Sequence, residues 1–366
     1  MSLWVDKYRP STLDDLDYHP DLTALFQQLA SSGDFPHLLL YGPSGAGKKT
    51  RASAVLRQIY GPCVEKLKLD VRVFQASASR KLEINVLSSP VHIELTPSDA
   101  GIYDRVVVQD LIKELAQTAQ VDPSARRAFK VVVINEADTL TRDAQQAMRR
   151  TMEKYMANLR IVLLAQSASQ IMGPIRSRCL MVRVPAVPAP DVVRVLGNVA
   201  KQEGLLLPPA FADHLASAAE GNCRAALLAL EAARLEHYPF SAAQPVPVAD
   251  WKVFCGTVAQ SILQEQSPAR LMQIRGKLYE LLAHCIPADM ILKEVMAKLI
   301  AGHGVFAGPQ AASGLASPSD LTVRVVQEAA TAEHRLRQGS KPIFHLEAFV
   351  ARVMSLYKRQ VVELGL

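Results

Sequence analysis

Two glycines and a lysine at fixed spacing are the residues most suited to binding phosphate. The run HLLLYGPSGAGKKT, residues 37–50, has the P-loop pattern of Gly, four residues, Gly and Lys between an apolar stretch and a helical one. Successive backbone N–H groups can turn inward around an anion there, and the dipole of the following helix favours negative charge. An ordinary glycine-rich turn is the alternative interpretation. The pattern predicts nucleotide binding by Gly42, Pro43, Ser44, Gly45, Ala46, Gly47, Lys48, Lys49 and Thr50.

Two departures from the usual pattern concern the metal ion that such loops hold. A hydrolysing P-loop protein has Ser or Thr after the lysine as an Mg²⁺ ligand, but this chain has Lys49 there, with Thr50 displaced by one position. The second anchor is normally an Asp ending a buried strand, but here it is Asn135, followed by Glu136 where a water-activating carboxylate would lie. Each change removes an oxygen ligand and adds positive charge. We expect ATP or ADP to bind with Mg²⁺ weakly held or absent, and with little or no hydrolysis.

A sheet must position these residues. The first half of the chain alternates apolar runs with helical periodicity, which predicts an α/β fold with a parallel sheet covered by helices. The near-continuous Val, Ile and Leu content of the runs suits strands buried on both faces. The predicted strands are residues 37–41, 92–95, 129–135, 159–166 and 180–184. In a helix predicted over residues 144–155, helical spacing predicts a core face of Ala144, Ala147, Met148, Met152 and Tyr155 and an outer face of Arg149, Arg150, Glu153 and Lys154.

Two proline-rich segments divide the chain. PAVPAP, residues 185–190, is predicted to be a linker, with Asp191 capping the helix that follows. A second linker, residues 238–248, leads into a segment whose apolar spacing stays helical to the end, apart from a loop expected at 308–320. Between the linkers, helices are predicted over residues 191–203, 209–220 and 222–236. We therefore expect three domains: 1–186 for nucleotide binding, 187–240 as a small helical domain, and 250–366 as an all-helical domain.

Composition indicates a folded globular protein, because hydrophobic residues make up 49% of the chain and charged residues 21%. Residues 126–183 carry 11 Lys and Arg against 4 Asp and Glu, which either a solvated face or a nucleic-acid contact would explain. The five cysteines have no zinc-ligand spacing, so we predict no metal cluster and reduced thiols in the cytosol or nucleus. MSLWVDKYRP lacks the apolar run that a signal peptide needs, and nowhere are 18 uncharged apolar residues contiguous, so we expect neither a signal peptide nor a membrane span.

Six motifs in order resemble the AAA+ clamp-loader family, specifically the replication factor C small subunits. They are WVDKYRP at 4–10, GPSGAGKK, INEAD, MRRTMEKY at 148–155, IRSRC at 175–179 and GNCRAAL at 221–227. With HIELTPSDAG at 92–101, the chain is most similar to the eukaryotic subunit with a GKK phosphate loop, the least competent ATPase of the set. The resemblance implies an AAA+ P-loop domain, a helical lid domain and an all-α collar domain that mediates oligomerisation.

The resemblance also implies roles at the nucleotide sites. Arg178 of IRSRC would be an arginine finger, which stabilises charge on the phosphoryl group in the adjacent subunit's site. Arg224 would be the sensor-2 arginine that reaches the subunit's own phosphates, and Gln166 stands where the family usually has the sensor-1 Asn. Glu136 corresponds to the Walker B glutamate, in a setting where it should not be productive. Val5, Tyr8 and Arg9 resemble the segment that packs near adenine.

The partners implied are one large and three other small replication factor C subunits, the sliding clamp PCNA, and primer-template DNA in the nucleus. DNA would be bound through backbone phosphates, with Arg80 and Lys81 as candidate contacts. Two alternatives remain: an autonomous P-loop ATPase acting on nucleic acid, and a structural subunit whose loop holds no nucleotide. Lys49 and Asn135 argue against the first, and nucleotide retained through purification would exclude the second.

Overall fold

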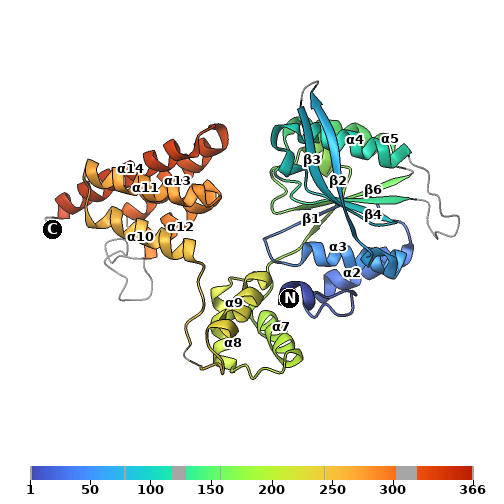
Figure 1. Cartoon of the computed structure of the whole chain (residues 1–366), viewed down its shortest axis with the longest axis horizontal. Coiled ribbons are helices and arrows are strands. Elements are labelled where there is room, and N and C mark those ends of the chain that lie inside the picture. The colour runs from blue at the N-terminus through green and yellow to red at the C-terminus, as the bar shows by residue number, and fades with distance from the viewer. Residues whose placement is uncertain are drawn as a thin grey trace. The chain divides into compact units, whose positions relative to one another are not determined.

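The computed structural model describes residues 2–77, 80–117, 129–156, 158–242, 244–301 and 320–364. The chain forms two compact units, Met1–Pro247 and Val248–Leu366 (Figure 1). The predicted three-domain division stays a prediction. The loop predicted at 308–320 lies outside the described residues, except for Asp320, which begins a helix.

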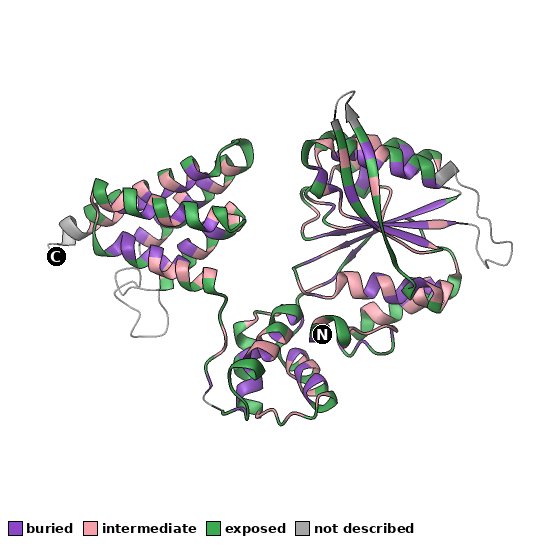
Figure 2. Ribbon diagram, viewed as in Figure 1, coloured by how far each residue is buried: buried purple, intermediate pink, exposed green. Residues whose placement is uncertain are grey.

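The first unit contains a seven-stranded sheet with strand order β2-β3-β4-β5-β6-β1-β7. The five strands predicted from apolar runs are confirmed, and each pairs in parallel with its neighbours among the five. Figure 2 shows that the middle of the sheet is buried. Because parallel strands end at the same edge, the residues that follow them come together there. These strands are β1 (Leu38–Tyr41), β4 (His92–Leu95), β5 (Lys130–Ile134), β6 (Leu159–Ala165) and β7 (Leu180–Arg183).

The sequence analysis missed two strands at the sheet edge. β2 (Lys68–Ser77) and β3 (Arg80–Ser88) form an antiparallel hairpin, and β3 also pairs antiparallel with β4. The prediction depended on near-continuous apolar runs, whereas β2 alternates apolar and polar residues, and its apolar Leu69, Val71 and Val73 are exposed. The sheet is therefore mixed rather than wholly parallel.

Helices cover both faces of this sheet (Figure 1). Val162 and Leu164 of β6 pack in the cluster that contains α2 and α3 side chains, and Ile161 and Leu163 pack in the opposite cluster with α4 and α5. These helices are α2 (Pro20–Ser32), α3 (Lys48–Tyr60), α4 (Asp104–Gln117) and α5 (Arg142–Lys154), and the short helices of this part are α1 (Trp4–Lys7), η1 (Pro62–Glu65), η2 (Pro97–Tyr103) and α6 (Gly173–Arg176).

The predicted faces of α5 are largely confirmed. Ala144, Met148 and Met152 are buried and the four charged residues of the outer face are exposed, while Ala147 and Tyr155 are half-buried. The helix begins two residues earlier than predicted, because the Thr141 side chain accepts a hydrogen bond from the Ala144 amide and caps it.

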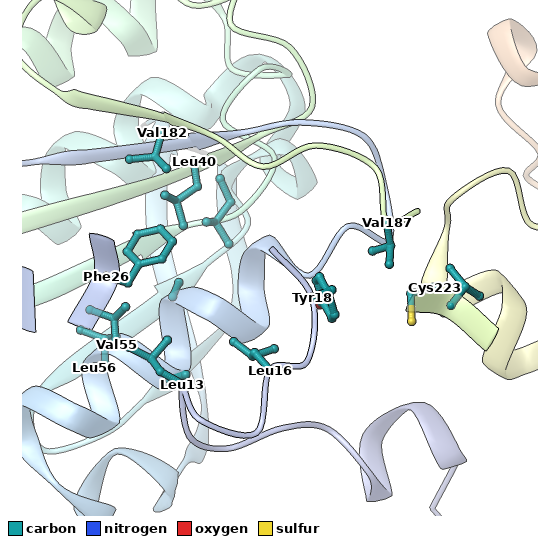
Figure 3. Close-up of a cluster of buried hydrophobic side chains, with 14 of the residues drawn as sticks. Leu13, Leu16, Tyr18, Phe26, Leu40, Val55, Leu56, Val182, Val187 and Cys223 are labelled. Carbon is teal, nitrogen blue, oxygen red and sulfur yellow. The ribbon is translucent and has the colours of Figure 1, made fainter. Parts of the chain in front are cut away.

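Three helices, which we call the lid, follow the sheet in the first unit: α7 (Ala189–Gln202), α8 (Pro209–Ala218) and α9 (Cys223–Glu236). The predicted cap at Asp191 is wrong. The helix begins at Ala189, because Pro190 is tolerated in a first turn, where its missing N–H needs no partner, and Asp191 pairs with Arg194 instead. Figure 3 shows Val187 and Cys223 beside Tyr18 in the cluster that also contains sheet residues. The lid therefore shares a hydrophobic core with the sheet.

Every regular element described in the second unit is a helix, as predicted. Its helices share one apolar cluster that includes Ile262, Ile291, Val325 and Phe349. No described helix is both long and apolar enough to cross a membrane. The helices are α10 (Asp250–Gln264), α11 (Pro268–Ala283), α12 (Ala288–Ala301), α13 (Asp320–Gln338) and α14 (Pro342–Leu364).

Candidate nucleotide-binding site

A cavity of about 1050 Å³ lies beside the carboxyl ends of the parallel strands, within the first unit. The phosphate loop, the strand ends, the N-terminal segment and the start of α9 all contribute to its wall. The predicted nucleotide residues that line it are Val5, Tyr8, Arg9, Ser44, Gly45, Gly47, Lys48, Lys49, Thr50, Asn135, Gln166 and Arg224, together with Glu136. Gly42, Pro43 and Ala46 belong to the same loop but do not line the cavity. A volume of this size is large enough for a nucleotide.

Two glycines give the phosphate loop its shape. Gly45 and Gly47 have φ values of 71° and 84°, in the left-handed region that residues with a Cβ rarely adopt. A Cβ on Gly47 would overlap the hydroxyl of Tyr18, and one on Gly45 would overlap Oδ1 of Asn222, the capping residue of α9. The loop therefore fits closely against both the N-terminal region and the lid.

Cationic groups converge on the cavity. The Lys48 ammonium donates hydrogen bonds to the carbonyl oxygens of Gly42, at 2.7 Å, and Pro43, at 2.8 Å. Burial lowers the pKa of Lys48, Asp138 opposes this shift, and the charge of Arg224 adds to it. Arg224 is the second residue of α9 and is exposed at the cavity wall. Because Lys48 and Arg224 repel each other, an anion bound near both would be stabilised.

Neither of the two positions that would normally ligate Mg²⁺ holds the usual hydroxyl or carboxylate. The Lys49 ammonium lies 2.6 Å from Oε2 of Glu94, and the Asn135 amide donates to the Thr96 hydroxyl at 3.5 Å. Lys49 offers Mg²⁺ no oxygen ligand and Asn135 offers a neutral amide oxygen in place of a carboxylate, so these side chains fit a tightly held magnesium ion poorly. Glu136 has a φ of 50°, a strained conformation for a residue with a side chain, and its carboxylate accepts from Ser98 at 3.5 Å.

The N-terminal segment is tied to the lid. The Tyr8 hydroxyl donates to the carboxylate of Glu203 in the last turn region of α7, and the Trp4 amide donates to Glu231 of α9 at 3.1 Å. These contacts hold Val5 and Tyr8 at the cavity wall, where an apolar and aromatic surface suits a purine ring.

Besides three residues of the phosphate loop, three further predicted site residues lie outside the cavity. Arg178 donates from Nε to the Glu153 carboxylate at 2.7 Å, in an ion pair with α5. Arg80 is the first residue of β3, and Lys81 is exposed beside it on the edge hairpin. The fold therefore separates these residues from the chain's own nucleotide cavity.

The sequence analysis missed several polar residues of this region. Tyr18, Thr96 and Asp138 also line the cavity, and Glu94 contacts Lys49 from beneath it. Asp138 belongs to the INEAD motif, so its charge next to Asn135 and Glu136 was a usable signal. Glu94 could also have been found, because it lies inside a predicted buried strand and acidic residues are rarely buried without a partner.

Sequence comparisons agree with this architecture. Residues 251–361 match the family described as replication factor C subunit 3, C-terminal domain, and residues 194–235 match the RCF1/5-like AAA+ ATPase lid domain. Residues 18–188 match the DNA polymerase III delta subunit family. Among solved structures, the Thermotoga maritima RuvB branch-migration motor has the same fold, with a TM-score of 0.50 at 13% identity, covering 87% of this chain and 98% of that one.

Full-length relatives define the family. Replication factor C subunit 5 of Neurospora crassa is 51% identical over 100% of both chains. Replication factor C subunit 3 of Homo sapiens is 49% identical over 98% of this chain and 97% of that protein. With the AAA+ fold and the lid and C-terminal domains of that family, the chain belongs to the replication factor C small subunits of the clamp loader.

Proposed function

We propose that this clamp-loader subunit binds a nucleotide that it hydrolyses weakly or not at all, and supplies an arginine finger to the neighbouring subunit. It assembles with one large and three other small replication factor C subunits. The pentamer opens the sliding clamp PCNA and places it on primer-template DNA in the nucleus. Full-length identity to relatives named as replication factor C subunits supports this assembly and its partners.

The observation that carries the nucleotide proposal is the convergence of Lys48, Lys49 and Arg224 on one cavity beside the phosphate loop. Lys48 and Arg224 offset the charge of the phosphates of ATP or ADP. Lys49, whose own charge is balanced by Glu94, can donate to a phosphate oxygen. Lys49 and Asn135 stand at the positions of the usual magnesium ligands, so magnesium is weakly held or absent and metal-assisted hydrolysis is impaired.

The proposal for Arg178 is supported by its location. It lies outside the chain's own cavity and pairs with Glu153 on α5. To reach a nucleotide in the neighbouring subunit, the guanidinium would have to leave this ion pair. A guanidinium supplied in trans increases the rate of phosphoryl transfer by about 10³-fold or more.

DNA contact is proposed for the edge hairpin. Arg80 and Lys81 begin β3, and Lys81 is exposed. Basic side chains at the tip of a two-stranded hairpin can bind backbone phosphates without base preference.

Reconstitution of the pentamer with Arg178→Ala in this chain tests the trans role. We expect clamp loading and DNA-stimulated ATP hydrolysis to fall, because the neighbouring site loses its stabilising charge. Arg176→Ala, which removes an exposed arginine two residues away, is the matched control and should behave as wild type. Unchanged loading and hydrolysis with Arg178→Ala would refute the role.

Two measurements on the isolated chain separate the alternatives. Nucleotide released from purified protein by denaturation is identified chromatographically, and an empty site would favour a purely structural subunit. Steady ATP turnover by the isolated chain that disappears with Lys48→Ala would instead favour an autonomous ATPase.

A further inference from the structure

A carboxylate is buried beneath the phosphate loop. Glu94 lies in β4 with only 4% of its side chain exposed. In the parallel register it is opposite Val133, whose side chain packs in the same cluster as α3, so Glu94 faces that helix. Burying a carboxylate is unfavourable unless a cation or hydrogen-bond donor compensates it.

Glu94 is compensated by cationic and donor groups from two elements. The Lys49 ammonium lies 2.6 Å from Oε2, and Nε2 of His92 lies 3.8 Å from Oε1. No donor in the described part of the chain makes an aligned hydrogen bond to Oε2, so Lys49 acts on it through charge. Burial by itself would raise the pKa of Glu94, but His92 and Lys49 outweigh burial and lower it. The carboxylate is therefore ionised at neutral pH.

Lys49 connects this carboxylate to the cavity. It is the second residue of α3, it lines the cavity, and 36% of its side chain is exposed although its ammonium touches a buried group. Lys49 therefore reaches from the cavity wall to the buried carboxylate, and it stands at the helix position where a P-loop protein places its hydroxyl ligand for magnesium. An ammonium carries three N–H donors, so one whose charge Glu94 balances can still donate to a phosphate oxygen without a metal ion.

We propose that Glu94 is a positioning residue that holds the Lys49 ammonium as a built-in cation, so that this chain binds a nucleoside diphosphate or triphosphate independently of divalent metal. The inference rests on the proposed nucleotide site and adds to it the residue that orients the cation. A pair that serves only to stabilise the fold is the competing explanation, and it makes no contribution to nucleotide affinity.

The first test measures the affinity of the full chain for a fluorescent ADP analogue, in excess Mg²⁺ and in excess EDTA. We expect the two dissociation constants of the wild type to agree within about twofold. With Lys49→Ser, we expect binding in EDTA to weaken by about tenfold to a hundredfold, the range for loss of a charge-assisted hydrogen bond. Added Mg²⁺ should restore part of this loss, because serine supplies a hydroxyl ligand.

The second test isolates Glu94. Glu94→Gln keeps the shape and removes the charge, so Lys49 must be ordered during binding, and we expect affinity in EDTA to fall by about threefold to tenfold. Lys66→Ser, at an exposed lysine outside the cavity wall, is the control and should leave both constants unchanged. The combined variant Lys49→Ser with Glu94→Gln leaves no uncompensated buried charge, and it should bind in EDTA as weakly as Lys49→Ser alone.

Several outcomes would overturn the inference. The first is a wild type that loses tenfold or more of its nucleotide affinity in EDTA, a loss on the order of one charge-assisted contact. The second is a Lys49→Ser variant or a combined variant that binds in EDTA as tightly as the wild type. The third is a Glu94→Gln variant that binds as tightly as the wild type or more tightly. A wild type that binds no nucleotide in either condition would instead refute the proposed nucleotide site itself.

Discussion

Replacing Gly45 by alanine should separate the phosphate loop from the lid. Gly45 has a φ of 71°, and a Cβ at this position would overlap Oδ1 of Asn222. Asn222 caps α9 by accepting a hydrogen bond from the Ala225 amide at 3.1 Å. The methyl group therefore forces the capping side chain away and displaces the start of the helix that carries Arg224.

The expected magnitude has two parts. A left-handed conformation costs a residue with a Cβ about 1–2 kcal/mol, and loss of the α9 cap costs about 1 kcal/mol more. Gly45→Ala should therefore destabilise the protein by about 2–3 kcal/mol. If displacement of the lid destabilises the nucleotide-bound state by at least the cap contribution of about 1 kcal/mol, nucleotide affinity should fall by about fivefold or more.

Gly204 provides the matched control. Its φ is 68°, but a Cβ there would have no atom within 4 Å, so Gly204→Ala carries only the backbone cost. Urea unfolding and the dissociation constant of a fluorescent ADP analogue are measured for both variants. Gly45→Ala combined with Asn222→Gly should recover part of the lost affinity, because glycine is also an acceptable cap. Equal destabilisation by the two alanine variants, with wild-type affinity in both, would refute the reasoning.

Three further predictions concern the first unit. Burial lowers the pKa of His37 from 6.5, and its Nδ1 accepts a hydrogen bond from the Ile161 amide at 3.0 Å. The imidazole is therefore protonated more readily in the unfolded chain than in the folded one. Stability should therefore be lost as pH falls from about 6.5 toward the folded pKa, by at most about 1.4 kcal/mol per pH unit, and His37→Asn should flatten this part of a urea-unfolding pH profile. Arg51 is fully buried and donates to the Tyr18 carbonyl at 2.6 Å, so Arg51→Met should cost about 2–4 kcal/mol by leaving that carbonyl without its donor, and an unchanged melting temperature would contradict this. Lys48→Ala should weaken binding of the ADP analogue by about tenfold or more, since one charge-assisted phosphate contact is lost. Calorimetric titration measures this affinity, and a smaller loss would contradict the prediction.

Local patterns in the sequence were enough for the parallel half of the sheet and for much of the site. Strands buried on both faces need near-continuous apolar residues, so β1, β4, β5 and β6 could be predicted from their apolar runs. β7 was predicted from the same kind of run, although Val182 is its one buried residue. The left-handed turns of the phosphate loop require glycine, so Gly45 and Gly47 mark the loop in any context. The β2–β3 hairpin was not predicted, because its alternating residues form no continuous apolar run.

The sequence alone was enough to place Lys49 and Asn135 at the positions of the usual magnesium ligands, because the motif spacing identifies these positions. Only the tertiary structure decided what those residues touch. Glu94 is 45 positions from Lys49 in the chain, and the two meet because α3 packs on the face of the sheet to which β4 presents its carboxylate. Such a contact depends on how separate elements pack, and local spacing holds no information about a partner on another element.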